Sequence, residues 1–174
     1  MLKLNAIVDT PVIEALYGAA QAGVDIDCII RGACSIQPGV PGVSERIHVR
    51  SIIGEFLEHS RIWGFENGGN AEWYIGSADL MDRNLDRRVE AVVPVEDSEA
   101  KARIAEIVDL MLADDRRSWQ LQPDASWVRT EVLQGREGTI DTFEVLKERA
   151  QSLGQVAAAP RRPGAGSGSL DPRA

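Results

Sequence analysis

The feature that most constrains the fold is a predicted helix that leads directly into a predicted buried strand. Residues 10–23, TPVIEALYGAAQAG, place Thr10 as the N-cap, Pro11 in the first turn and a glycine at the end. Residues 24–32, VDIDCIIRG, follow as a β-branched run that ends beside Arg31. A helix closed by glycine and joined at once to such a run is typical of α/β folds.

The remaining pattern predicts a mixed sheet flanked by helices. In chain order we expect strands within residues 46–53, 60–65, 71–78 and 89–95, a helix over 97–115, a short strand around 127–133 and a helix over 139–153. Asn67-Gly68-Gly69 is a hairpin signal, so the strands on either side of it should be adjacent and antiparallel, and we place them centrally in the sheet. The core is expected to include Val12, Leu16, Ile29, Ile30, Ile52, Phe56, Ile62, Ile75, Val92, Val93, Ile107 and Leu112.

Length and composition are those of one globular domain with a tail. A chain of 174 residues with 44% hydrophobic and 26% charged residues can bury a substantial core. We place the domain over residues 1–156. Residues 157–174 are rich in proline, glycine and serine, and we predict that they are disordered.

Charge and hydropathy exclude several classes of protein. A net charge of −8 argues against broad binding to nucleic acid or to an anionic membrane. No stretch approaches the roughly 18 apolar residues of a membrane span, and the N-terminus lacks the pattern of a signal peptide. We therefore expect a cytoplasmic protein. Cys28 and Cys34 are expected to be small buried residues, because no His/Cys cluster lies near them.

His59 and Arg61 interrupt an otherwise strand-like stretch, EHSRIWGF, at residues 58–65. In an extended chain a period of two places both side chains on one face. An imidazole beside a guanidinium combines a proton donor with a rigid, bidentate anion clamp. We interpret the pair as a candidate anion site, although a core-edge histidine beside a surface arginine is the commoner outcome for such a pair taken alone.

Polar residues also end the next predicted strand. Ser77 and Asp79 follow an apolar run, and the hairpin should bring them close to His59 in one shared site. DRNLDRR at residues 82–88 then adds three arginines that its aspartates only partly balance. In an acidic protein, arginines gathered beside such motifs predict a local anion site and not a basic surface.

These motifs resemble a known superfamily. His-x-Arg at residue 59 and Gly-Ser-x-Asp at residue 76 are similar to the His-x-Lys and Gly-Ser-x-Asn pattern of phospholipase D, with arginine for lysine and aspartate for asparagine. One branch is much more similar. The segments IVDTPVIEALYGAAQAGVDIDCIIRG, QPGVPGVSE, VRSIIGEFLEHSRI, IGSADLMDRNLDRRVE and PVED resemble, in unbroken order from about Lys3 to Arg149, the C-terminal phospholipase-D-like domain of polyphosphate kinase.

The resemblance implies reversible transfer of the terminal phosphate of ATP to polyphosphate, with Mg²⁺ and through a phosphohistidine. It implies that Arg31, in the Arg-Gly motif, binds the nucleotide phosphates and that His59 contacts them as a catalytic residue. It also implies that Arg88 makes a further phosphate contact. The reading of the residues adds Arg61 to this set, because phosphoryl transfer depends on positioning and on stabilising charge. ATP and polyphosphate are therefore the expected ligands.

The chain also departs from the family pattern. The histidine that is phosphorylated in the family lies in an upstream domain, as do the groups that hold Mg²⁺ and the adenine. His48, the only other histidine, is interpreted as a strand-surface residue and not as the nucleophile. We therefore expect no metal ligands here, and we expect a fragment that acts with an upstream half or as a homo-oligomer, from a truncated gene or a split enzyme.

Three functions stay open from the sequence. The first is the C-terminal catalytic half of a polyphosphate kinase, contributing Arg31, His59 and Arg88. The second is a dimeric phosphodiesterase of the phospholipase D type, with His59 as nucleophile. The third is a non-catalytic module that binds polyphosphate or nucleotide.

Overall fold

The computed structural model describes residues 1–158. It contains two compact units, residues 1–143 and the residues from 144 onward. Helix α5 (Thr142–Ala158) begins with the last two residues of the first unit, and its residues 144–158 are the described part of the second. The tail that we predict to be disordered begins at residue 157. Its first two residues are the last of α5, and the rest of it lies outside the described residues.

Within the described residues, eight strands form one mixed sheet in the order β6-β5-β4-β1-β2-β3-β7-β8. The strands are β1 (Leu2–Leu4), β2 (Ile26–Ile30), β3 (Ile47–Ile52), β4 (Ile62–Phe65), β5 (Glu72–Gly76), β6 (Val92–Pro94), β7 (Ser118–Leu121) and β8 (Trp127–Arg129). β1, β2 and β3 are parallel to one another, and every other pairing is antiparallel.

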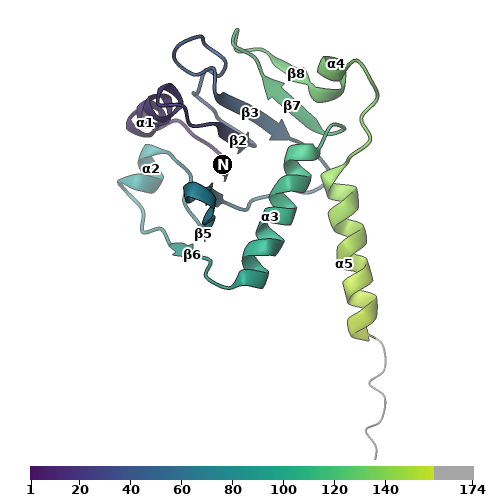
Figure 1. The fold of residues 1–174 in the computed structure, drawn as a ribbon. Helices are drawn as coiled ribbons and strands as arrows, with labels where there is room; N and C mark the ends of the chain where they lie inside the picture. The colour runs from purple at the N-terminus through teal and green to yellow at the C-terminus, as the bar shows by residue number, and fades with distance from the viewer. Residues whose placement is uncertain (159–174) are drawn as a thin grey trace, which may run out of the picture. The chain divides into compact units, whose positions relative to one another are not determined.

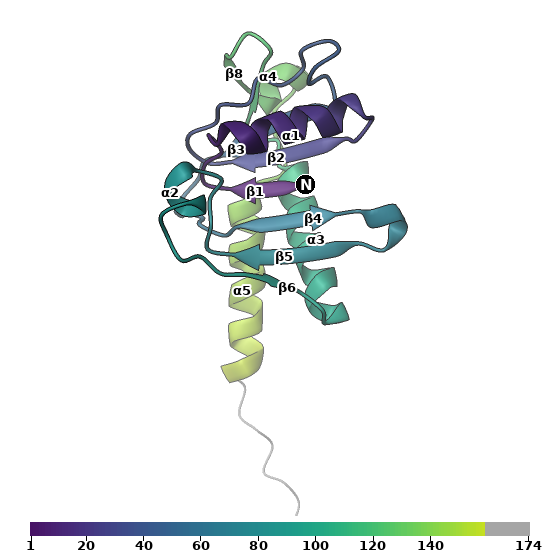
Figure 2. The same ribbon diagram turned by 90° about the vertical axis from the view of Figure 1, so that its left-hand side faces the viewer.

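Two helices of the first unit cover opposite faces of this sheet, as Figure 2 shows. α1 (Thr10–Gln21) packs on one face over a cluster that includes Leu4 and Ile30. α3 (Ser98–Ala113) packs on the other face through Met111 against Ile29. The predicted mixed sheet flanked by helices is therefore confirmed. The short helices are α2 (Asp82–Leu85), α4 (Thr130–Gln134) and the 3-10 turn η1 (Asn67–Gly69) (Figure 1).

The predicted hairpin is confirmed, and its turn explains its sequence. β4 and β5 pair antiparallel, with Ile62 opposite Ile75. Asn67, Gly68 and Gly69, in the turn between them, have φ angles of 46°, 62° and 92°. Glycine and asparagine adopt such left-handed backbone most readily.

The structure corrects three details of the sequence analysis. Asp9, and not Thr10, caps α1, because its carboxylate accepts the Val12 N–H at 3.1 Å while Thr10 is already helical. β1 and β2 occupy the centre of the sheet in place of β4 and β5, since the unpredicted β1 inserts between β4 and β2. Among the expected core members, Ile75, Val92 and Val93 prove to be exposed because β5 and β6 form the outer edge of the sheet, and Phe56, in the segment before β4, is exposed as well.

The sheet order gathers several chain segments at one end of the sheet. β1 and β2 run in parallel and finish there, so the residues that follow them are neighbours. β5 finishes at the same end, and the antiparallel β4 starts there. Residues that follow β1, β2 and β5, or precede β4, are thereby brought together.

Gly76, at the end of β5, is required by close packing. A Cβ atom there would lie 2.6 Å from the carbonyl oxygen of Ala91 and 3.0 Å from the Trp63 ring. We expect Gly76→Ala to destabilise the chain by about 1–3 kcal/mol, as overpacking does. Gly18→Ala, in α1, is the matched control, because nothing lies within 4 Å of a Cβ atom added there. Alanine at this helical position should raise the free energy of unfolding by about 0.5–1 kcal/mol. Urea unfolding of both variants checks this, and a neutral Gly76→Ala would contradict the packing.

Candidate functional site

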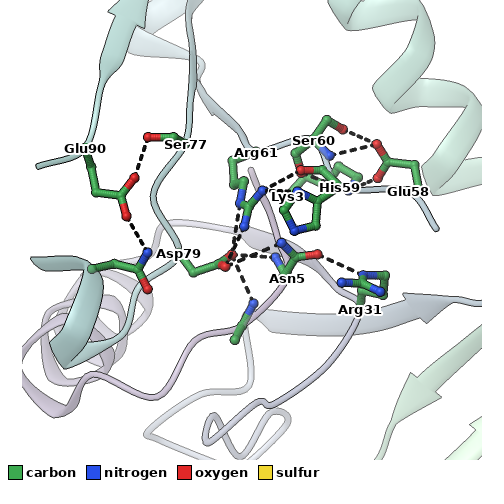
Figure 3. Close-up of polar contacts among 12 residues, drawn as sticks. Lys3, Asn5, Arg31, Glu58, His59, Ser60, Arg61, Ser77, Asp79 and Glu90 are labelled. Carbon is green, nitrogen blue, oxygen red and sulfur yellow. Dashed lines mark hydrogen bonds and ion pairs between the residues drawn. The ribbon is translucent and has the colours of Figure 1, made fainter. Parts of the chain in front are cut away.

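Five polar side chains meet at the end of the sheet where β1 and β2 finish (Figure 3). Asn5 follows β1 and Arg31 follows β2, while Asp79 lies just beyond β5. His59 and Arg61 lie in the segment before β4, which begins at Ile62. The expectation that His59 and Arg61 are strand residues sharing one face was therefore wrong, although the two side chains do come together.

Asp79 is the centre of this group and is only 3% exposed. Its Oδ1 accepts the backbone N–H groups of Asn5 at 2.7 Å and Ala6 at 3.3 Å. Arg61 forms a bidentate ion pair with it, from Nη2 to Oδ2 at 2.8 Å and from Nε to Oδ1 at 3.3 Å. Burial of Asp79 opposes its ionisation, but the bonds from Arg61 and Asn5 outweigh this, so the pKa of Asp79 lies below its usual value.

Arg61 continues the contact to His59. Its Nη1 lies 2.6 Å from the Nδ1 of His59 and 2.7 Å from the His59 carbonyl oxygen. A guanidinium has donors and no acceptor, so Nδ1 must accept this hydrogen bond. The ring hydrogen therefore resides on Nε2. The exposed His59 thus offers an N–H donor to a ligand from its far side.

Arg31 joins the same network from the other direction. Its Nε donates to the Oδ1 of Asn5 at 2.8 Å, and the Nδ2 of Asn5 lies 3.4 Å from the Oδ2 of Asp79. Within the described residues its two terminal nitrogens make no hydrogen bond. A continuous series of contacts thus runs from His59 to Arg31, and a free guanidinium edge and a free imidazole N–H lie at its two ends.

Lys3 was missed by the sequence analysis. It is 3% exposed, donates to the Ser60 carbonyl oxygen at 3.0 Å and pairs with Glu58. Burial lowers the pKa of Lys3, and Arg31 and Arg61 contribute to the lowering, while Glu58 opposes it. The pair holds the segment before β4 against β1. A lysine between two leucines near the N-terminus was the only available signal.

Ser77 takes part in a neighbouring network. Its hydroxyl donates to Glu90, which also accepts from the Nδ2 of Asn84 at 2.6 Å. These two bonds lower the pKa of Glu90, with a smaller contribution from Arg88. In the described structure Ser77 makes no hydrogen bond to His59, so the expected sharing of one site is found for Asp79 and not for Ser77. Arg88 is exposed in the loop that Glu90 anchors.

The side chains at this end of the sheet do not suit a bound magnesium ion. Mg²⁺ takes oxygen ligands, whereas Arg31, Arg61 and His59 present N–H donors. The Asp79 oxygens are already engaged by Arg61 and backbone amides. Among the described residues no group of three or more His, Cys, Asp or Glu side chains could hold a metal ion.

Two other expectations concern residues away from this site. His48 is exposed on β3, which confirms it as a strand-surface residue. Cys28 is buried, and burial raises the pKa of its thiol to about 12. Cys34 is half-buried, so the expectation of burial is met fully only by Cys28. Across residues 1–158, none of the helices has both the length and the apolar character that crossing a bilayer requires.

The lowered pKa of Asp79 predicts a pH dependence of stability. Ionised Asp79 favours the folded state at every pH above the unfolded pKa, about 3.9, and this contribution is lost as pH falls through the lower folded value. Asp79→Asn should therefore lower the free energy of unfolding at pH 7, and its deficit should shrink below about pH 4. Urea titrations at several pH values measure this. A deficit that stays constant down to the acid limit would contradict the assigned ion pair.

Comparison with known proteins matches this chain to one family throughout most of its length. The family model for polyphosphate kinase C-terminal domain 2 matches residues 1–139. The polyphosphate kinase of Thermosynechococcus vestitus is 57% identical over 147 residues, covering 84% of this chain and 20% of the relative. That of Pseudomonas aeruginosa is 53% identical over 149 residues, covering 86% of this chain and 21% of the relative.

A solved structure agrees with the sequence comparisons. The crystal structure of polyphosphate kinase from Porphyromonas gingivalis superimposes with a TM-score of 0.80 at 34% identity, over 89% of this chain and 24% of that chain. The expected phospholipase-D-like α/β fold class is thereby confirmed. The chain spans about a fifth of the length of the curated relatives it matches. Over the matched residues, it belongs to the family of polyphosphate kinase C-terminal domains.

Proposed function

We propose that this chain supplies the phosphate-binding part of a site that transfers the terminal phosphate of ATP reversibly to polyphosphate. The observation that carries the proposal is the hydrogen-bonded series from His59 through Arg61, Asp79 and Asn5 to Arg31. It leaves the terminal nitrogens of Arg31 and the Nε2–H of His59 for a ligand. Both are donors of the kind that phosphate oxygens accept.

These donors suit phosphoryl transfer. The transferred group spreads negative charge over its oxygens, and catalysis depends mainly on positioning and on stabilising that charge. The Arg31 fork can hold two phosphate oxygens at once. His59, with its hydrogen on Nε2, donates a hydrogen bond to a phosphate oxygen and so stabilises the negative charge that the transfer develops there. Arg88 is proposed as a further contact from its exposed loop.

The same geometry argues against His59 as a nucleophile. Attack on phosphorus requires a lone pair on the free ring nitrogen, and that nitrogen carries the hydrogen while Arg61 donates to Nδ1. A phosphodiesterase of the phospholipase D type is therefore less well supported. The phosphorylated histidine is proposed to belong to an upstream half, or to another polypeptide.

The source of Mg²⁺ and the place of action are also part of the proposed function. Mg²⁺ is proposed to arrive with ATP and to be held by groups outside this chain, because the side chains that face a ligand here are N–H donors. The need for ATP as phosphate donor favours the cytoplasm as the place of action. A module that binds polyphosphate without turnover would use the same two donors, so binding and transfer need separate measurements.

Binding is tested by titrating tripolyphosphate into the purified chain. Arg31→Ala and His59→Ala should each weaken binding about 10- to 100-fold, since a hydrogen bond to a charged group contributes about 1.5–3 kcal/mol. Arg46→Ala is the control, because Arg46 lies before β3, at the opposite end of that strand, and pairs with Asp25. Equal affinity in all four proteins would contradict the proposed site.

Transfer is tested with γ-labelled ATP, Mg²⁺ and a polyphosphate primer, with the label counted in acid-insoluble polymer. We expect the chain alone to incorporate no label. A relative's polyphosphate kinase, truncated to remove the domain that matches this chain, should restore synthesis when it is added to the wild-type chain. Added to the His59→Ala chain, the same truncated kinase should not restore synthesis. Polymer made by this chain alone would show that no upstream histidine is needed.

A further inference from the structure

We propose that Asp79 is a positioning residue that holds the Arg61 fork so that His59 keeps its Nε2–H form, at a fixed distance from Arg31. The importance of this for phosphate rests on the proposed function. The geometry itself can be tested without any phosphate. The proposal depends on how the donors of Arg61 are used, on how Asp79 is anchored and on the connection to Arg31.

Arg61 is largely committed to the protein. Of the five N–H groups of a guanidinium, two donate to Asp79 and two to His59. Its side chain is only 10% exposed. One N–H, on Nη2, is left for a phosphate oxygen. Arg61 therefore influences ligand binding mainly by orienting the imidazole of His59.

Asp79 is itself fixed by the backbone. The N–H groups of Asn5 and Ala6 hold its Oδ1, directly after the central strand β1. This leaves Oδ2 to hold the Nη2 of Arg61. Because the backbone fixes the carboxylate, it cannot shift if the guanidinium moves. Without this hold the guanidinium could turn toward an approaching anion, and Nδ1 of His59 would lose its donor.

The same carboxylate connects the two donors that face a ligand. Asn5 receives the Nε–H of Arg31 at 2.8 Å while its own backbone N–H binds Asp79. Asp79 thus stands between His59 and Arg31 and fixes their separation. Two donors at a fixed separation lose less conformational entropy on binding a polyphosphate than two independently moving side chains do.

Asp79→Asn is a selective test of this role. The asparagine keeps one carbonyl oxygen for the Asn5 and Ala6 amides, but it places an NH₂ group at the position of Oδ2. The bond from Arg61 Nη2 is then lost, together with the longer contact from the Nδ2 of Asn5. Asp25→Asn is the matched control. It makes the same chemical change at an exposed ion pair with Arg46, before β2, at the opposite end of that strand.

The first readout is the ¹⁵N spectrum of the two imidazoles. His48 is exposed on β3 and serves as an internal reference in every sample. In the wild type we expect His59 to show an unprotonated Nδ1 that is coupled across the hydrogen bond to Arg61. In Asp79→Asn this coupling should vanish. The ¹⁵N chemical shifts of both His59 ring nitrogens should then move toward those of the exposed reference His48. Unchanged His59 signals in a folded Asp79→Asn chain would overturn the proposal.

The second readout is the sign of the change in affinity for tripolyphosphate. Removing a negative charge beside an anion site would by itself strengthen binding. The positioning role predicts the opposite, a loss of about 10-fold or more, corresponding to about 1.4 kcal/mol, with no change in Asp25→Asn. Equal or tighter binding by Asp79→Asn would overturn the proposal.

Arg61→Lys gives the same test where Asp79→Asn fails to fold. It keeps the positive charge, but a lysine ammonium cannot hold Asp79 and His59 with the geometry of a fork. We expect the coupling between His59 and residue 61 to vanish, as in Asp79→Asn, and the affinity for tripolyphosphate to fall by the same factor. Wild-type His59 signals in folded Arg61→Lys would overturn the proposal. The spectra need no phosphate, so failure of the proposed function, seen as no binding by the wild type, is distinguished from failure of this inference.

Discussion

The carboxylate of Asp79 is the contact on which the arrangement of this site depends. It is almost fully buried, and it receives two backbone amides after β1 and the guanidinium that precedes β4. A buried charge is stable only when it is paired and hydrogen-bonded. The fold meets this requirement with groups from two segments, one after β1 and one before β4, while Asp79 itself follows β5. The charge therefore specifies how the ends of β1, β4 and β5 lie relative to one another.

Two departures from the phospholipase D pattern prove to be one contact. Arginine stands in place of lysine at residue 61, and aspartate stands in place of asparagine at residue 79. In the structure these two residues form the bidentate pair at the centre of the site. A neutral asparagine has only one acceptor oxygen and could not hold both arms of the arginine, and a lysine could not bridge a carboxylate and an imidazole as a fork does. Each exchange is therefore understandable in the presence of the other.

The sequence predicted those parts of the fold that have a repeating pattern. α1, β2 and α3 were recognised because their apolar residues recur over several turns or form a β-branched run. β1 was missed because three residues with a lysine in the middle carry no period, and β7 was missed for a similar reason, being short and polar at its start. Exposure of Ile75 was not predictable either, because it depends on which strand lies at the edge of the sheet.

The candidate site was predicted in composition but not in contacts. The closeness of Asp79 to His59 was expected from the hairpin that the turn residues reveal, whereas Arg61 was placed beside His59 by the period of two. The direction of each side chain did not follow, since His59 and Arg61 precede the strand. Lys3 and Asn5 were not predicted, because they reach the site only through the central position of β1. Ser77 bonds to Glu90, a partner thirteen residues away that no local pattern marks.

The central position of the short strand β1 has a consequence for assembly. Its pairing with β4 joins only two residues of each strand, Leu2 with Trp63 and Lys3 with Ile62. That seam divides the three strands β4, β5 and β6 from the five strands β1, β2, β3, β7 and β8. Asp79 and the Lys3–Glu58 pair cross it. The contacts that close the sheet at this seam are therefore also those that bring His59 to Arg31, so a change that opens the seam separates these two donors.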